Sequence, residues 1–337
     1  MDDHREIQQA EPRVLAVPSE FSGKTVREFL RDALPLEPLE FLRHMVKSGN
    51  VTVQGKTVER KQRLKAGDSV AIRHLQRESD AFRTPVIPAE VLYEDRDVLV
   101  LNKPAGCTVV RKRNTEHCAF QNGILAYLKR SPEAAEAAAR ERYRPRAVHR
   151  LDRDTTGVLV EAKTRAGELH LMQQFQNRSV EKTYLTVVRG EVAEDAGIIE
   201  KPIGPVEGDI SRMKIGGRYG KSSLTEYTVR ERFRGLTFLE VRLHTGRRHQ
   251  IRLHFAHIGH PVLADGVYGG GKDFRLSEVK HGYKLAKGAE ENPLIDRPAL
   301  HASTIALLPV GASDSVRVEA PLPHDMEVLL KMLRKYA

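Results

Sequence analysis

Apolar residues recur at helical spacing in the first part of the chain. Segment 24–34 carries one such stripe, made of Val26, Phe29, Leu30 and Leu34. A second helix is predicted over 38–49, because Pro38 suits a helix start and Gly49 a helix end. Alternation around Gln54-Gly55 then predicts a β-hairpin, and 67–75 predicts a further strand. Residues 20–75 are therefore expected to form a small α/β domain.

Short strand-like runs dominate the chain from residue 89 onward. They occupy segments 97–106, 157–163, 182–192, 223–233, 236–245 and 301–310. Consecutive strands joined by turns favour an α+β architecture with a largely antiparallel mixed sheet and flanking helices. An exposed helix is expected over 135–142. The last helix, 324–337, is expected to pack through Met326, Leu329, Leu330 and Leu333.

The length of 337 residues suits two domains of ordinary size. Residues 76–88 are polar and contain two prolines, which is typical of a linker. We therefore divide the chain into an N-terminal tail (1–19), the small domain (20–75), the linker (76–88) and a second domain (89–337).

Composition narrows the class of protein. Hydrophobic residues make up 40% of the chain, which suffices for folded cores, and no apolar run approaches the roughly 18 residues of a membrane span. The acidic, polar N-terminus lacks the features of a secretory signal. Cys107 and Cys118 are too few for a disulfide framework or a cysteine-rich metal site. These features predict a cytoplasmic protein with reduced thiols.

The charge is uneven along the chain. The formal net charge is +10, and segment 41–77 holds nine Lys/Arg against Glu59 and Asp68. Clustered cations of this kind favour a polyanionic partner, most often nucleic acid.

The order of elements in residues 20–75 resembles the small RNA-binding domain named after ribosomal protein S-four. In that domain the second helix and the hairpin form the RNA face. The resemblance implies RNA contacts from Arg43, His44, Lys47, Lys56, Arg60, Lys61 and Arg63. A charged hairpin without a ligand is the alternative.

Segment 146–163 sets charges of both signs directly before an apolar strand: His149, Arg150, Asp152, Arg153 and Asp154. Segment 243–254 adds Arg247, Arg248 and Arg252 after a Thr-Gly turn. A guanidinium beside Asp152 would lower the pKa of that carboxyl and keep it ionised for catalysis. Scaffolding ion pairs look the same in sequence, so the residues alone leave both interpretations open.

The stretch HRLDRDTTG (149–157) is similar to the catalytic motif of the RluA-type pseudouridine synthases, with Thr156 where serine is commoner. Four further segments resemble motifs of that family in the same order, namely 94–106, 181–190, 243–269 and 297–309. Arg248 stands where the family commonly has threonine. The family commonly has a short histidine-containing stretch after Gly106, whereas this chain reads CTVVRKRNTEHCAF over 107–120, so the resemblance is weaker in this segment. The resemblance spans about residues 90–310.

The resemblance implies isomerisation of uridine in RNA to its C-glycoside, a reaction that requires neither a redox cofactor nor a metal. Asp152 would be the catalytic carboxylate, acting either as a nucleophile at C1′ or as a base at C2′. Arg252 would keep Asp152 ionised, Tyr184 would lie against the uracil, and Leu243 would form an apolar wall. Lys182 is expected to be a structural charge near the site.

A nucleotide inside folded RNA must be flipped out before reaction. Arg150 and His149 are candidates for contacts with the displaced base, although His149 equally suits an ordinary turn. Segment 211–223 is expected to be a mobile hairpin loop that grips RNA phosphates through Arg212, Lys214, Arg218 and Lys221; a merely solvated loop is the alternative.

Two other classes of protein are weighed. A metal-dependent hydrolase would use His249, His254, His257 and His260, but no HExxH spacing accompanies them. A non-catalytic RNA-binding or ribosome-assembly protein would not need Asp152 and Arg252 at the motif positions. Ribosomal RNA of the large subunit is the favoured substrate and transfer RNA the alternative. No obligate protein partner is implied, and the oligomeric state is left open.

Overall fold

The computed structural model describes residues 12–58, 62–73, 90–109, 120–285 and 288–337. The chain divides into two compact units. Unit 1 comprises residues 1–88, 111–146 and 163–165, and unit 2 comprises 89–110, 147–162 and 166–337. Among the described residues, no helix is long and apolar enough to cross a bilayer.

Unit 1 begins with a small α/β fold that confirms the two predicted helices, the hairpin and the strand after it. Its elements are β1 (Arg13–Ala16), a 3₁₀ turn (Ser19–Phe21), α1 (Val26–Ala33), α2 (Leu39–Lys47), β2 (Val51–Val53), β3 (Lys56–Thr57) and β4 (Ser69–Ile72). The four strands form an antiparallel sheet in the order β1-β4-β2-β3. Thr25 and Glu28 cap α1 reciprocally. Gln54 and Gly55 both have positive φ, as a tight hairpin requires.

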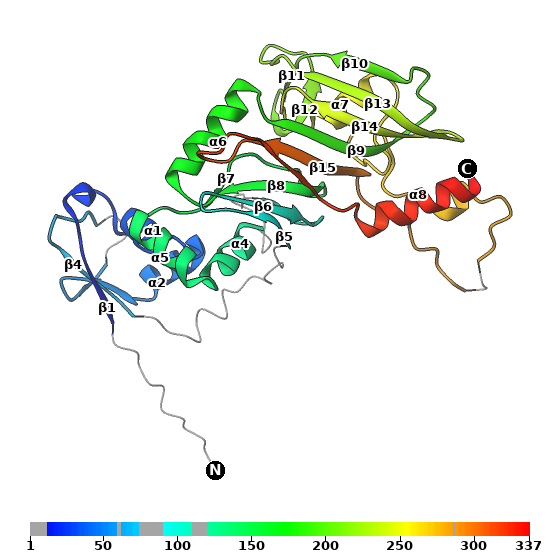
Figure 1. The fold of residues 1–337 in the computed structure, drawn as a ribbon. Helices are drawn as coiled ribbons and strands as arrows, with labels where there is room; N and C mark the ends of the chain where they lie inside the picture. The colour runs from blue at the N-terminus through cyan, green and yellow to red at the C-terminus, as the bar shows by residue number, and fades with distance from the viewer. Residues whose placement is uncertain (1–11, 59–61, 74–89, 110–119, 286–287) are drawn as a thin grey trace. The chain divides into compact units, whose positions relative to one another are not determined.

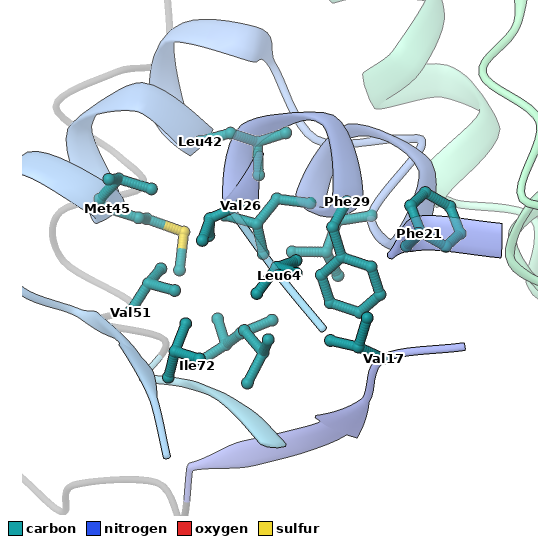
Figure 2. Close-up of a cluster of buried hydrophobic side chains, with 14 of the residues drawn as sticks. Val17, Phe21, Val26, Phe29, Leu42, Met45, Val51, Leu64 and Ile72 are labelled. Carbon is teal, nitrogen blue, oxygen red and sulfur yellow. The ribbon is translucent and has the colours of Figure 1, made fainter. Parts of the chain in front are cut away.

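The helices pack on this sheet around one apolar core (Figure 2). Phe29, Leu30 and Met45 face Val51 and Ile72 in that core. Val17 is buried in it as well, and Arg13–Ala16 pairs with β4. The prediction that residues 1–19 form a tail is therefore wrong for 13–19. The four residues of β1 include one half-buried position, so they show no alternation of buried and exposed side chains. Their pairing with β4 makes them a strand. Residues 1–11 and the predicted linker 76–88 lie outside the described residues.

Two further helices of unit 1, α4 (Phe120–Lys129) and α5 (Pro132–Glu141), come from the part of the sequence assigned above to the second domain. Lys129 forms an ion pair with Glu37 at 2.5 Å, and Arg142 one with Glu20 at 2.6 Å. Arg144 donates to the backbone carbonyls of Pro35 and Glu37. These long-range contacts leave no mark on local periodicity, so the predicted boundary at residue 89 misses them.

Unit 2 is built on a large sheet, which confirms the α+β fold class. The path of its strands is β10-β13-β14-β9-β15-β8-β6-β5, with β16 paired to β15 and β7 to β8. Their bounds are β5 (Glu90–Glu94), β6 (Val98–Lys103), β7 (Arg146–Ala147), β8 (Thr156–Ala162), β9 (Glu181–Arg189), β10 (Ala196–Glu200), β13 (Leu224–Phe233), β14 (Leu236–Leu243), β15 (Leu300–Leu307) and β16 (Val316–Glu319). β8 and β15 pair in parallel and the other pairs along this path are antiparallel.

Helices cover different parts of this sheet (Figure 1). Leu171 of α6 (Arg165–Asn177) packs with apolar residues of β6, β8 and β15. The last helix, α8 (His324–Tyr336), buries Met326, Leu329, Leu330 and Leu333 in the cluster that contains Val187 of β9, as predicted. Because side chains alternate along a strand, Tyr184 of β9 points to the face opposite Val187. The remaining helices are α7 (Gln250–His257) and a 3₁₀ turn (Leu276–Glu278).

The segment predicted as a mobile loop is partly a strand. β11 (Ile203–Val206) and β12 (Asp209–Ile215) form a separate antiparallel hairpin. Arg212 and Lys214 therefore lie on β12, whereas Arg218 and Lys221 follow it. The sequence of β12 was assigned to a loop because Gly216-Gly217, directly after it, is typical of a turn.

Gly157 permits the parallel pairing of β8 with β15. Its φ is +109°, and a Cβ atom there would lie 2.1 Å from the Ala302 carbonyl oxygen. We expect Gly157→Ala to lower the free energy of unfolding by about 3 kcal/mol or more, since backbone must move to admit the methyl group. Gly235→Ala is the matched control: φ is +72° but nothing lies within 4 Å, so only about 1 kcal/mol is expected. Equal losses for the two variants in urea unfolding would contradict this account.

Candidate active site

Lys103 holds the loop between β7 and β8 in place through hydrogen bonds. This lysine ends β6 with 0% of its surface exposed, and its Nζ donates to the backbone carbonyls of Pro104, Arg153 and Thr155 at 2.8, 3.0 and 2.9 Å. Burial lowers the pKa of Lys103 to about 8. The sequence alone assigned Lys103 no role. A lysine that follows closely on the apolar run 98–101 was the available signal.

Arg297 holds the same loop from another direction. Its Nη1 donates to the carbonyl oxygen of Asp154 at 3.2 Å and to that of Leu300 at 3.3 Å. Its Nε and Nη2 bind the Asp325 carboxylate of α8 at 2.7 and 2.8 Å. The loop that carries Asp152 is thus attached to β6, to β15 and to α8.

The structure brings together Asp152 and Arg252. Nη1 of Arg252 lies 3.1 Å from Oδ2 of Asp152, whose side chain is 21% exposed. Arg252 stands near the start of α7, which follows the Thr-Gly turn. This distance is that of a charge-assisted hydrogen bond.

Asp265, which the sequence analysis did not single out, orients Arg252. Its carboxylate accepts from Nε and Nη2 of Arg252 at 2.7 and 2.8 Å and is 0% exposed. The backbone N–H groups of Val267 and Tyr268 also donate to it. Burial alone would lower the pKa of Arg252, but the hydrogen bonds and charge of Asp265 outweigh it and raise that pKa above its ordinary value. The fork of Arg252 therefore binds Asp265, and its remaining nitrogen faces Asp152.

His249 lies near the other carboxylate oxygen of Asp152. It caps α7 in the left-handed conformation, with φ 56°. Its Nδ1 is 2.7 Å from the Tyr268 hydroxyl, and its Nε2 is 3.7 Å from Oδ1 of Asp152. Burial lowers the pKa of His249 to about 4 despite the opposing charge of Asp152, so the ring is neutral at pH 7. Sequence analysis had considered this histidine only as a metal ligand.

A cavity of about 100 Å³ opens beside Asp152. Its apolar walls come from Leu151, Leu243 and Leu300, and Tyr184 lines it together with Asp152 and Arg252. Tyr184 is 9% exposed. Burial, and then the charge of Asp152, raises the pKa of its hydroxyl, so the phenol keeps its proton at pH 7. The predicted uracil contacts, Tyr184 and Leu243, thus lie in one cavity with the predicted catalytic pair.

A second cavity, of about 500 Å³, adjoins the first. Arg150, Tyr184 and Leu243 line both. Lys182 lies at its wall, half-buried, and burial followed by the charge of Arg178 lowers the pKa of its ammonium group. Arg150 is exposed.

His149 has the contacts of a turn histidine. Its Nε2 accepts the N–H of Val160 at 3.0 Å, and its ring stacks on Phe175 at 5.2 Å. Burial lowers its pKa to about 3, so the ring is neutral. These contacts favour the structural alternative for His149, although the ring also lines the second cavity.

The RNA-contact candidates are mostly exposed. Arg43, Lys47 and Lys56 are exposed on α2 and β3, and Arg63 donates to the carbonyl of Gly23. His44 is half-buried. Arg60 and Lys61 lie outside the described residues. In unit 2, Arg212, Arg218 and Lys221 are exposed and Lys214 is half-buried.

Two of the histidines considered as metal ligands, His254 and His260, are bound to protein groups. Nε2 of His254 lies 3.1 Å from both the Ser223 hydroxyl and the Lys201 carbonyl, and Nδ1 of His260 lies 3.0 Å from the Arg189 carbonyl. Within the described ranges, no three His, Cys, Asp or Glu side chains are grouped for a metal ion.

Comparison with known proteins places this geometry in a family. The model of the RNA pseudouridylate synthase family matches residues 97–257. "Ribosomal large subunit pseudouridine synthase D" of Xanthomonas campestris pv. campestris is 34% identical over 330 residues, which cover 96% of this chain and 93% of the relative. An RNA pseudouridine synthase of Aquifex aeolicus is 37% identical over 269 residues, 79% of this chain and 82% of that protein.

A solved structure shares the fold. The human protein "RNA Pseudouridylate Synthase Domain Containing 4" matches 73% of this chain and 93% of its own, with a TM-score of 0.54 and 23% identity. The sequence relatives extend the likeness to nearly the whole chain. The chain therefore belongs to the RNA pseudouridine synthase family, and it is an isomerase that converts uridine in RNA to pseudouridine.

Proposed function

We propose that this enzyme isomerises uridine in the ribosomal RNA of the large subunit, with Asp152 as the catalytic carboxylate. One observation carries the assignment of the site: Asp152 lies 3.1 Å from a guanidinium that a buried aspartate holds in place, at the wall of the cavity that contains Tyr184 and Leu243. The substrate class is supported by the names of the relatives, which are large-subunit enzymes in several bacteria. Transfer RNA is the alternative.

The reaction breaks the N1–C1′ bond of uridine and forms a C5–C1′ bond. The electron pair of the broken bond leaves with the uracil, so C1′ becomes electron-poor beside Asp152. The carboxylate then either bonds to C1′ or takes the C2′ proton to leave a glycal. After the base has turned, C5 attacks C1′. On the first route the Asp152–C1′ bond breaks as the C5–C1′ bond forms, and on the second route the proton taken by Asp152 returns to C2′. The C5 proton then departs and N1 gains a proton, so the product is an isomer of the substrate. Both routes use the carboxylate of Asp152, which accepts a hydrogen bond from the Arg252 guanidinium.

The apolar cavity serves to keep water from the intermediate. Water at C1′ would yield an abasic site instead of pseudouridine. Leu151, Leu243 and Leu300 surround the reacting position, and Tyr184 lies against the base. Because the pKa of Tyr184 is raised, its hydroxyl acts in the protonated form, as a hydrogen-bond donor or proton relay and not as a phenolate. Arg150, exposed at the mouth of both cavities, is suited to contact the RNA strand that the flipped nucleotide leaves.

Exposed cations of both units supply sequence-independent RNA affinity. In unit 1 these are Arg43, Lys47 and Lys56, and in unit 2 Arg212, Arg218 and Lys221. A cytoplasmic location and the absence of an obligate protein partner stay predictions.

Unmodified transcripts of the two candidate RNAs test which class of RNA is the substrate. The purified chain is incubated with unmodified large-subunit ribosomal RNA and, separately, with unmodified transfer RNA from the organism that carries the gene. Pseudouridine is mapped by carbodiimide labelling and primer extension. We expect new pseudouridine in the ribosomal transcript. Conversion confined to transfer RNA would overturn the substrate class, and no conversion in either RNA would overturn the activity assignment for this chain.

His249 is expected to position Asp152. If the Tyr268 hydroxyl donates to Nδ1, the neutral ring carries its proton on Nε2, facing Oδ1 of Asp152. His249→Gln keeps an N–H donor near that position, whereas His249→Met has similar length and no donor. We expect kcat to fall by about 10- to 100-fold in His249→Met and by about fivefold or less in His249→Gln, with KM nearly unchanged in both. Equal kcat values for the two variants would show that the histidine does not act through its N–H.

A further inference from the structure

The cavity of about 500 Å³ beside the catalytic cavity has walls from three segments. These are the start of the Asp152 loop (148–150), one side of α6 with the turn after it (172–178), and the end of β14 with the loop that follows (243–247). It shares Arg150, Tyr184, Leu243, Gly246 and Arg247 with the catalytic cavity, so the two are continuous. A volume of about 500 Å³ lies within the roughly 300–1,000 Å³ usual for small-molecule sites.

The charge of this cleft is positive. Arg150, Arg178, Lys182 and Arg247 line it, and among the described residues of its lining none is an aspartate or a glutamate. The cations crowd one another, as the effect of Arg178 on the pKa of Lys182 indicates. An anion placed between them would relieve this repulsion. The cleft is therefore suited to a negatively charged ligand.

One wall of the cleft is apolar and aromatic. Met172 of α6 is 43% exposed although its side chain is large and hydrophobic. Phe175, three positions further along the same helix face, stacks on His149. The centroid of its ring lies 5.9 Å from the Nζ atom of Lys182. A flat apolar wall among cations is the combination that single-stranded nucleic-acid sites use, since bases stack on it and phosphates pair with the charges.

We propose that this cleft binds a nucleotide that neighbours the isomerised uridine in the RNA strand. Its base lies against Met172 and Phe175, and its phosphate faces Arg178 and Lys182. This inference rests on the proposed function, because the flipped uridine in the adjoining cavity places the neighbouring nucleotide here. Stacking and a phosphate contact accept any base, so the cleft holds the RNA strand beside the target uridine and adds affinity there.

Binding is measured first, without turnover. The probe is a fluorescent single-stranded uridine pentanucleotide, and the full chain carries Asp152→Asn in every sample. Met172→Asp places a carboxylate on the base-binding wall and is expected to weaken binding by about 10-fold or more. Arg178→Gln is expected to weaken it by about 3- to 10-fold and to lower the slope of log affinity against log salt by about 0.7, the share of one phosphate contact. Both positions are exposed on α6 or just after it, so folding should not be affected.

Matched controls are exposed positions outside the cleft. Val310→Asp repeats the first change at an exposed hydrophobic residue, and Lys331→Gln repeats the second on α8. Both are expected to bind the pentanucleotide within twofold of the parent chain. If Met172→Asp and Arg178→Gln bind the pentanucleotide as tightly as the control variants do, the proposal is overturned, whether or not the enzyme converts uridine.

The second measurement uses the RNA fragment that the enzyme with Asp152 intact converts. Each nucleotide next to the target uridine is replaced in turn by an abasic ribose. Loss of the base that occupies the cleft is expected to lower kcat/KM by about 10- to 100-fold, the effect of one stacked base. In Met172→Asp the same abasic substitution should have little further effect. If the effect of the abasic substitution and that of Met172→Asp were independent at every position, the assignment of this cleft to a neighbouring nucleotide would be contradicted. If the pentanucleotide binds as expected but no uridine is converted, the RNA cleft stands and the proposed function fails.

Discussion

Asp152→Asn is expected to lower kcat by about 10⁴-fold or more while the affinity for RNA changes by less than about threefold. Asparagine has nearly the shape of aspartate, but it neither attacks C1′ nor accepts the C2′ proton. Catalytic groups of this kind typically account for losses of that order. RNA affinity is kept because the exposed cations that face phosphates lie elsewhere, on β12 and α2 among other elements.

Tritium release gives the measurement, since the hydrogen at C5 of uridine leaves during isomerisation. RNA labelled at C5 is used for turnover, and filter binding of the same RNA gives the affinity. Asp154→Asn is the matched control, two positions away in the same loop. Its side chain is 46% exposed and its nearest cation, Arg153, is 4.0 Å away, so kcat should stay within about threefold. A kcat in Asp152→Asn above about a tenth of the unmodified value would remove Asp152 from the chemistry.

Asp265→Asn is expected to be the most destabilising single change in the site, with a loss of about 3–5 kcal/mol in the free energy of unfolding. Asp265 is fully buried and binds Arg252 in a two-bond fork. Removing its charge leaves Asp152 as the one carboxylate in salt-bridge range of the buried Arg252 guanidinium among the described residues, and a poorly compensated buried charge is costly. Because Arg252 also loses its orientation, kcat should fall by about 100-fold even at temperatures where the variant is folded.

A surface pair of the same geometry provides the comparison. Glu231 binds Arg334 through two hydrogen bonds of 2.8 and 2.6 Å, but both side chains are substantially exposed. Glu231→Gln is expected to cost less than about 1 kcal/mol and to leave kcat unchanged. Urea unfolding and tritium release at a temperature well below the melting transition separate the two effects. If Asp265→Asn behaved like Glu231→Gln, Asp265 would not be the group that holds Arg252.

Periodicity predicted the local elements well, because burial of one face leaves a repeating pattern. The stripe of Val26, Phe29 and Leu30 became α1, and Met326, Leu329 and Leu330 face the core from α8. The Gln54-Gly55 turn was predictable because few residues other than glycine accept its backbone angles. Strand β1 and the membership of α4 and α5 in unit 1 were missed, since they depend on pairing and ion pairs with distant residues.

Motifs predicted which residues would meet in the site, but not what holds them. The similarity of segments 149–157 and 243–269 to one family pointed to Asp152 and Arg252. Lys103 and Asp265, which hold the Asp152 loop and Arg252, stand in segments 94–106 and 243–269 and were assigned no role. A buried charge and an exposed charge look alike in a sequence, and only burial shows that Lys103 and Asp265 have no solvent to replace their partners.

By itself, the sequence determined the helices and strands with a clear periodicity, the fold class and the family of this protein, because each of these rests on the order of residues along the chain. Only the tertiary structure decided that Arg252 faces Asp152, 100 positions away in the sequence, and that His249 lies near the other carboxylate oxygen of Asp152. It also decided that the uncharged ring of His149, stacked on Phe175, belongs to the wall of a cationic cleft. Distances, burial and the pKa values that follow from them arise between strands and helices that are remote in the chain. The folded arrangement, and not the local pattern, therefore sets the chemistry of the site.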